Sequence, residues 1–424
     1  MNKLLNCLNN HPGVSDYKIN VHKKESYELF FVKGKLETVR CTDTCDTEVT
    51  VYADHGEFKG DAQFFVYPST TEDQLKALVD EAAHKALLIN NKSYALPENE
   101  QGEYQVESNF AAFAPHELAK QIADCTFAAN TVENASLNAV EVFVNKHTDT
   151  VINSRNLHKT QVRYDAMVEA IPTYNGAEQS VELFHETSFS HFDKATITRD
   201  TADKLREVKA RYEAKAPAAP IDCPVVFGHK ELMRILFSVV RDLNYASVYS
   251  HANLFKKGDA IQKAPEGDLI TLTMAGESKG STRSAAFDSD GLSLSPVCLV
   301  EKGTAVSYFG SNRFGQYLGE KPTGDMSCMV LSPGSAPADA FTKGPHLEIL
   351  SMSGLQVDFF NDYIGGEVRL AYHNDGEKVT PVTGISISGK VSDVLNHILL
   401  SENVVNRNGY TGPDKALLSG MKIF

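Results

Sequence analysis

The first half of the chain shows one pattern of hydrophobic and polar positions twice. From Tyr27, the stretch YELFFVKGKLETVRCTDTCDTEVTVY alternates apolar and polar residues, as strands with one buried face do, and GEFKGDAQFFVYPS continues the pattern. A helical pattern, TEDQLKALVDEAAHKALL, follows with apolar residues at three-and-four spacing. From Val140 the same order recurs and ends in the helical pattern TRDTADKLREVKARYEAK. The repetition predicts two sheet-plus-helix units, over about residues 15–90 and 139–214.

The hydrophobic pattern of the rest of the chain differs from that of the two predicted units. A helical pattern near residues 115–130 links the two predicted units, and after Ala214 the Pro- and Ala-rich segment KAPAAPIDCP favours a domain boundary. Beyond it the pattern is mostly strand-like, with one predicted core helix over 231–243 that is apolar nearly all round, and a polar tail, ENVVNRNGYTGPDK. The prediction is an α+β protein with an N-terminal domain over 1–214 and a β-rich C-terminal domain over 221–424.

Composition and charge narrow the class of protein. The 424 residues carry 41 Lys and Arg against 55 Asp and Glu, and the formal charge of −14 argues against a nucleic-acid partner. No apolar run approaches the roughly 18 residues of a membrane span, so no membrane partner is expected. The N-terminal apolar run is too short for a signal peptide, and seven scattered cysteines do not form a disulfide framework. We therefore expect a cytoplasmic protein.

Five short tags follow one another between Phe287 and Gly389: FDSDG, LVEKGTAVSYFGS, KPTGD, SMSGLQVDFFNDYIGGEVRLAYHNDGE and PVTGISISG. In this order they resemble the TldD/PmbA family, the so-called modulators of DNA gyrase, classed as U62-type peptidases. The resemblance implies a pair of related chains. One chain of such a pair carries an HExxxH zinc-peptidase motif, and the PmbA or TldE type lacks it. The likeness is strong over the second half of the chain and weaker before it.

The segment PVVFGHKELMRILFSVVRDLNYASVYSHANLFKKGDA corresponds to the family's motif helix and the residues after it. The resemblance places Phe237, Ser238 and Asp242 where a catalytic member has His, Glu and His. A phenyl ring and a hydroxyl replace neither an imidazole ligand nor a general-base carboxylate. Catalytic members also have a Cys in a Gly-rich turn near the C-terminus, where this chain reads NGYTGPDKALLSG. We therefore expect no catalytic residue, metal site or cofactor here, and zinc only in a catalytic partner.

Other catalytic patterns have less support. HETSFSH looks like a stretched zinc motif, but His185 and His191 would converge on one metal neither on a helix nor on a strand, so edge-strand histidines are predicted. His229 and His251 flank the motif helix, where adventitious metal binding or ordinary surface and cap roles are both open. The chain contains no GxSxG string and no phosphate loop.

A peptide-binding role remains. The segment SGLQVDFFNDY resembles the family stretch near the peptide groove, and it makes Gly354, Gln356 and Asp358 the candidates for groove contacts. A strand edge there would hold an extended peptide through main-chain hydrogen bonds. The alternative is that these residues form a structural turn.

The expected function is that of a non-catalytic, zinc-free subunit of a TldD/PmbA-type metalloprotease assembly that acts on unfolded proteins or peptides. Its expected partners are a TldD-like catalytic subunit, a second copy of itself in isolation, and the unfolded peptide substrate. Two alternatives stay open. One is an active metallopeptidase in its own right, and the other is a homodimeric peptide-binding protein without proteolysis.

Overall fold

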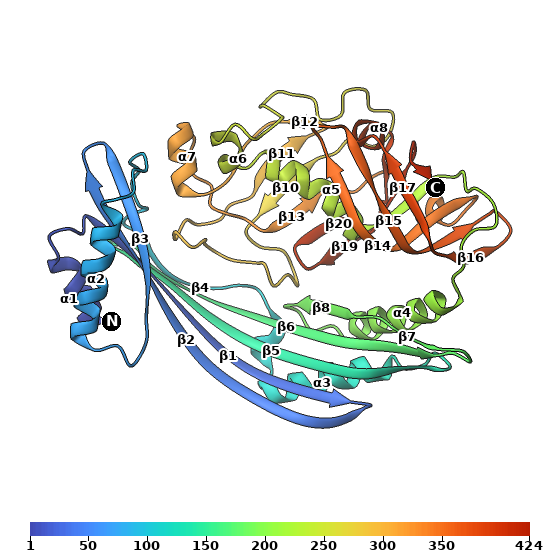
Figure 1. Ribbon diagram of the computed structural model, residues 1–424, viewed down its shortest axis with the longest axis horizontal. Helices are drawn as coiled ribbons and strands as arrows, with labels where there is room; N and C mark the ends of the chain where they lie inside the picture. The colour runs from blue at the N-terminus through green and yellow to red at the C-terminus, as the bar shows by residue number, and fades with distance from the viewer.

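A computed structural model describes residues 1–424 and confirms the α+β class (Figure 1). The N-terminal half forms one long, curved sheet with the C-terminal half above it in this view. The sheet contains eight strands: β1 (Asp16–Val32), β2 (Lys35–His55), β3 (Phe58–Val66), β4 (Gln101–Gln105), β5 (Ala135–Asn153), β6 (His158–Asn175), β7 (Ser180–Glu182) and β8 (His185–Phe189). The helices of this half are α1 (Asn2–Asn10), α2 (Glu72–Ala86), the short 3₁₀ helix η1 (Asn109–Ala112), α3 (Pro115–Ala128) and α4 (Lys194–Glu213).

The strand order β3-β2-β1-β5-β6 places two long antiparallel hairpins side by side, with β1 and β5 in the centre. The outer edge of β6 is covered in turn by β4, β8 and β7. A helix, a long hairpin, a further strand and a second helix therefore follow in the same order twice, as α1, β1, β2, β3, α2 and as α3, β5, β6, β8, α4. The hydrophobic pattern did not predict α1.

The helices begin where their capping residues allow. Thr71 forms a capping box with Gln74 at the start of α2, in which the Thr71 hydroxyl accepts from the Gln74 amide at 3.3 Å. α4 begins at Lys194, earlier than its pattern predicted, because the Asp193 carboxylate accepts from the amides of Ala195 and Thr196.

One face of the N-terminal sheet is apolar and packs on helices, and the other is polar. Leu4 and Leu8 of α1 pack with Ile19 and Val49 at one end of the apolar face. α3 and α4 cover Val140, Val142 and Val144, among others, at the other end. The alternate positions, whose side chains point the opposite way, include the buried polar residues Lys18, Asn145, Lys159 and Gln161.

The C-terminal half contains two further sheets around a single core of 38 buried residues. The six-stranded sheet has the order β12 (Thr304–Ala305), β11 (Val297–Glu301), β10 (Leu272–Ala275), β13 (Cys328–Leu331), β20 (Tyr410–Pro413), β19 (Val404–Arg407). The eight-stranded sheet has the order β18 (Leu399–Leu400), β21 (Lys415–Leu418), β9 (Val225–Gly228), β14 (His346–Asp358), β15 (Tyr363–Asn374), β17 (Ile385–Gly389), β22 (Lys422–Ile423), with β16 (Val379–Val382) beside β15. The helices are α5 (His229–Asp242), α6 (Tyr245–Tyr249), α7 (Asn312–Leu318), the 3₁₀ helix η2 (Ala338–Phe341) and α8 (Val391–His397).

Two predictions for this half are wrong. The helix expected to be apolar nearly all round is α5, and it is amphipathic: Leu232, Ile235 and Val239 are buried, whereas Arg234 and Arg241 are exposed. It covers the core with one face only, because its other face borders a cavity. The expected polar tail is structured as well, since its residues form β19, β20 and the start of β21.

The FDSDG tag, residues 287–291 of the C-terminal half, contacts the N-terminal half. Asp290 accepts from the buried Lys18 of β1 at 2.5 Å, and the Gly291 carbonyl accepts from Lys159 of β6 at 2.8 Å. Phe287 packs against Leu157 in a small cluster between the halves. Gly291 has φ +84° and a Cβ there would lie 2.7 Å from Leu157, so the turn requires glycine. No helix of the chain is long and apolar enough to cross a membrane.

Candidate functional site

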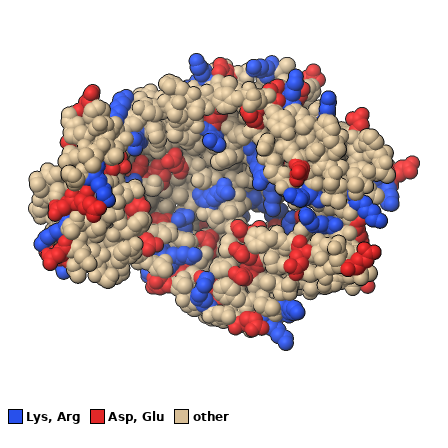
Figure 2. All heavy atoms as spheres, viewed as in Figure 1, with Lys and Arg blue, Asp and Glu red and all other residues tan.

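A cavity of about 2460 Å³ lies between the two halves. β8 and α4 of the N-terminal half line one wall, and α5, one side of β14 and the loops at 279–283, 325–327 and 405–409 line the other. Figure 2 shows its opening, with Lys and Arg gathered on the upper rim and Asp and Glu on the lower rim. A cavity of this size has room for a segment of polypeptide, since small-molecule pockets measure about 300–1,000 Å³.

The motif positions on α5 divide between the cavity and the core. Phe237 and Ser238 line the cavity, and the Phe237 side chain is 57% exposed. An exposed phenyl ring therefore lies where the family resemblance leads one to expect a catalytic member's first histidine. Neither side chain supplies a lone-pair nitrogen or a carboxylate to the cavity.

Asp242, the third motif position, lies outside the cavity lining and is only 8% exposed. Its carboxylate oxygens accept from the amides of Leu254 and Phe255 at 2.7 and 2.9 Å. Burial raises the pKa of Asp242, and these two hydrogen bonds oppose that rise. The carboxylate therefore closes the loop after α6, which is a structural role.

The imidazoles near α5 are separated from one another. His229 is the first residue of α5 and stacks on Tyr410, and burial together with Arg407 lowers the pKa of His229 to about 4. His251 lies after α6 with φ +56°. No group of three or more His, Cys, Asp or Glu side chains is placed to share a metal ion.

β8 also borders the cavity. It is hydrogen-bonded to β6 alone, and all five of its residues, from His185 to Phe189, line the cavity. His185 is therefore an edge-strand histidine, as predicted, whereas His191, for which the same was predicted, lies beyond the end of β8. His185 is 6% exposed, its Nε2 has no hydrogen-bond partner, and burial with the nearby Lys204 and Lys230 lowers its pKa to about 4. The imidazole is thus neutral at pH 7.

The three predicted groove residues lie on β14 and the turn after it. Beyond Glu348, β14 is hydrogen-bonded to β15 alone, so its second edge is free. Gly354 and Gln356 line a separate cavity of about 630 Å³. Asp358 lines neither cavity, and its carboxylate accepts from the amides of Phe360 and Asn361 in the turn after the strand. The large cavity is lined instead by Leu355 and Val357, which alternate with the predicted pair.

A bulge sets this alternation. The register between β14 and β15 shifts between Ser353 and Gln356, and Gly354 there has φ +69°. Because the side-chain period of a strand is two, a shift of one residue exchanges its faces. The sequence analysis did not single out Leu355 and Val357, which line the large cavity, because the position of the bulge was not known.

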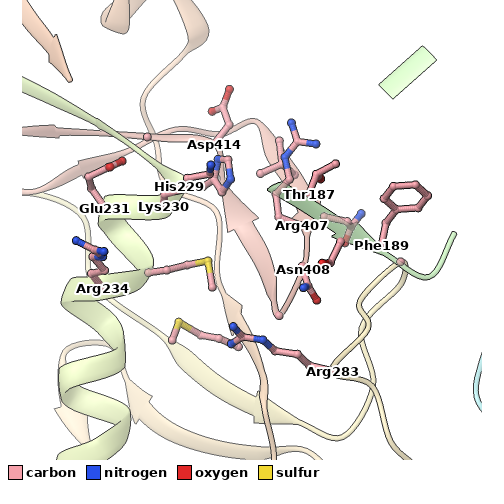
Figure 3. Close-up of a pocket in the computed structure, with 18 of the residues that line it drawn as sticks. Thr187, Phe189, His229, Lys230, Glu231, Arg234, Arg283, Arg407, Asn408 and Asp414 are labelled. Atoms are coloured by element: carbon pink, nitrogen blue, oxygen red, sulfur yellow. The ribbon is translucent and has the colours of Figure 1, made fainter. Parts of the chain in front are cut away.

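The sequence analysis also missed the charge of the cavity. Eleven of the lining residues are Lys or Arg and nine are Asp or Glu, although the whole chain has a formal charge of −14. Figure 3 shows Lys230 and Arg234 on the first turns of α5, Arg283 extending toward that helix from a loop, and Thr187 and Phe189 on β8 at the far side. The spacing of Lys230, Arg234 and Arg241 along α5 could have indicated a basic face.

Residues 220–424 match the PmbA/TldA metallopeptidase C-terminal domain family. The chain is 24% identical over 419 residues to a metalloprotease PmbA homolog of Haemophilus influenzae, an alignment that covers 92% of this chain and 88% of the relative. The C-terminal half, residues 220–424, therefore belongs to the TldD/PmbA family, and the whole chain is similar to a PmbA-type relative.

Solved structures share the fold over the full length. TldE from Thermococcus kodakarensis has a TM-score of 0.79 at 16% identity, with 99% of each chain covered. A proposed modulator of a DNA gyrase from Thermotoga maritima has a TM-score of 0.79 at 14% identity, with 100% of this chain and 99% of that chain covered. At these identities the similarity defines the fold alone.

Proposed function

We propose that this chain is a zinc-free, non-catalytic subunit of a TldD/PmbA-type metalloprotease assembly, and that it holds unfolded polypeptide in its large cavity. The observation that carries the proposal is the cavity face of α5, where Phe237 and Ser238 occupy the first two motif positions. The third, Asp242, is engaged by two backbone amides. A hydrolytic zinc site requires donors and a general base at these positions, and this residue set lacks them.

The free edge of β14 supports the peptide-holding part of the proposal. Main-chain groups from Ile349 onward have no strand partner on that side, while Leu355 and Val357 from the same strand line the cavity. An extended peptide added to such an edge gains main-chain hydrogen bonds, and apolar side chains on the wall accept its alternate residues. Phe237 adds an exposed aromatic surface on the facing helix.

The proposal includes an assembly. A second copy in isolation, or a TldD-like subunit in the cell, would dock on the β-rich C-terminal half and bury well over the roughly 1,200 Å² of a stable interface. The catalytic partner would supply zinc and the general base. The seven cysteines are all free, which supports a cytoplasmic location for the assembly.

Reconstitution tests the assembly. Size-exclusion chromatography with light scattering should give a homodimer of the purified chain at micromolar concentration, and a complex after mixing with an HExxxH-bearing homologue. The mixture should cleave labelled unfolded casein faster than the homologue alone, whereas this chain alone should cleave nothing above background. Elemental analysis after dialysis should find no stoichiometric zinc. One tightly held zinc per chain, with cleavage by the chain alone, would instead identify an active metallopeptidase.

A variant pair tests the cavity. Phe237→Ala should weaken binding of a labelled unfolded peptide about tenfold, since the ring offers an apolar contact worth roughly 1.5–3 kcal/mol. Phe65→Ala removes a ring that is 50% exposed on β3, outside the cavity, and should leave binding unchanged. Fluorescence anisotropy measures both. A monomeric chain with no peptide binding and no effect on a partner's proteolysis would refute the proposal.

A further inference from the structure

Six basic residues of the cavity form no ion pair: Lys194 at the start of α4, and five others on the wall opposite α4. Lys230, Arg234 and Arg241 lie on α5, and Lys279 and Arg283 lie on the loop at 276–286; all five side chains line the cavity and are exposed. None has a carboxylate oxygen within 4 Å. We call these five residues the cationic wall.

The geometry of α5 gathers three of them on one stripe. Residues 230, 234, 237 and 241 fall within about 60° around the axis of a helix that turns 100° per residue. Phe237 therefore lies between Arg234 and Arg241 on the same stripe. Arg283 extends toward this helix from the opposite side, as Figure 3 shows.

The other basic residues of the cavity, apart from Lys194, each pair with a carboxylate. Arg407 contacts Asp200 at 3.0 Å and Lys415 contacts Glu348 at 2.5 Å. Lys204 and Arg206 pair with Glu207 and Asp203, their neighbours on α4. Four of the nine acidic lining residues are thus occupied by cations outside the cationic wall.

The acidic residues that remain do not neutralise the wall either. The Asp193 carboxylate caps α4. Burial raises the pKa of both Glu231 and Asp325, and neither carboxylate forms an ion pair with a wall residue. Glu186 and Asp414 form no ion pair with any wall residue. The pKa of Lys230 is lowered by enclosure and by the nearby Lys204, so the positive charges here oppose one another.

Positive charges gathered on one wall repel one another, and this chain has a surplus of acidic residues that could have offset them. A carboxylate-bearing ligand relieves that repulsion, and arginine binds carboxylates with two parallel hydrogen bonds. The free β14 edge and the apolar residues Leu355, Val357 and Phe237 favour a peptide over a nucleic acid. A peptide backbone offers both N–H and C=O groups to a strand edge, whereas a phosphate backbone has no N–H to donate to the edge carbonyls.

We infer that the cavity binds acidic segments of unfolded polypeptide, with peptide carboxylates on the cationic wall and alternate apolar side chains on β14 and Phe237. This inference rests on the proposed peptide-holding function and names its substrate class.

The test compares two labelled peptides of one length that differ only in Glu against Gln, measured by fluorescence anisotropy with the full chain. The Glu peptide should bind about tenfold or more tightly than the Gln peptide, and its affinity should fall as salt rises. The double variant Arg234→Gln with Arg283→Gln should remove this preference. Lys120→Gln with Lys263→Gln changes the net charge equally at exposed positions outside the cavity and should leave it intact.

The outcomes separate this inference from the proposed function. Equal binding of both peptides, weakened by Phe237→Ala, would retain the peptide-holding function and overturn the acidic preference. Tighter binding of a single-stranded oligonucleotide than of the Glu peptide, lost in the Arg234→Gln, Arg283→Gln variant, would also overturn it. Binding of neither peptide by a folded chain would overturn both proposals.

Discussion

Phe237 and Asp242 are five residues apart on α5, which separates their side chains by about 140° around the helix axis. The ring of Phe237 consequently faces the cavity, and the carboxylate of Asp242 faces the loop after α6. Two positions that the family resemblance groups as ligands of one metal thus have unlike environments in this chain. One is free to contact a ligand, and the other stabilises the fold.

His185 makes a prediction about pH. Its pKa of about 4 in the folded protein lies below the roughly 6.5 of an exposed histidine, so the unfolded state binds more protons between these values. The stability it contributes is complete above pH 6.5 and is lost as pH falls toward 4. Between pH 7 and pH 5 the loss should be about 2 kcal/mol.

Urea unfolding of the wild type and His185→Gln at both pH values measures this loss. Other groups, including Asp288, titrate in both proteins, so the informative quantity is the stability gap between them. That gap should move in favour of the variant by about 2 kcal/mol at pH 5. His84→Gln, which replaces an exposed histidine of α2, is the control and should show no such movement. An unchanged gap for His185→Gln would mean that the histidine is not held neutral.

At the scale of elements, α5 and β14 form the cavity wall because each has two unlike faces. α5 buries its aliphatic face in the core and turns its basic stripe to the cavity. The bulge at Gly354 directs Leu355 and Val357 into the large cavity and Gly354 and Gln356 into the smaller one. The loop after α6 is tied to α5 by Asp242.

Removing the Asp242 carboxylate, which accepts two backbone hydrogen bonds, should destabilise the protein. Asp242→Ala leaves the amides of Leu254 and Phe255 without acceptors, and we expect the free energy of unfolding to fall by about 2 kcal/mol. Asp242→Asn keeps one acceptor and should lose less. Asp339→Ala removes an exposed carboxylate and should leave stability almost unchanged. Urea unfolding at pH 7 measures all three, and full stability in Asp242→Ala would contradict the structural role.

At the scale of the molecule, polar contacts join the two halves and keep the cavity open between them. Lys159 of β6 is fully buried, and its ammonium group contacts Glu100, the Gly291 carbonyl and the Ser293 hydroxyl. The latter two belong to the tag loop of the C-terminal half. Arg407 and Asp200 form a second link between the halves.

Lys159→Met should therefore weaken the contact between the two halves and destabilise the protein. Two acceptors of the tag loop lose their donor, and we expect about 2 kcal/mol of lost stability, measured by urea unfolding. Lys85→Met is the matched control, because it breaks an exposed pair with Glu81 on α2 and should cost under about 1 kcal/mol. Equal losses in the two variants would show that the buried lysine has no special role.

The sequence alone determined the α+β class, the recurring order of strands and helices, the family and the motif residues. These follow from local information, namely the side-chain periods of 2 and 3.6, capping residues and short ordered tags. The same local reading missed α1 and assigned strands β19 and β20 to a polar tail, because their partners lie far away in the chain.

Only the tertiary structure decided which residues share the cavity. The bulge at Gly354 depends on pairing with β15, and it settled which of Gly354, Leu355, Gln356 and Val357 face the large cavity. The exposure of Phe237 and the burial of Asp242 likewise depend on what packs against α5. The cationic wall brings α5 together with a loop more than thirty residues further along, and pairing with Asp200 and Glu348 decided which cations stayed free. Charge and burial at a site are sums over neighbours in space, and those neighbours are set by long-range packing.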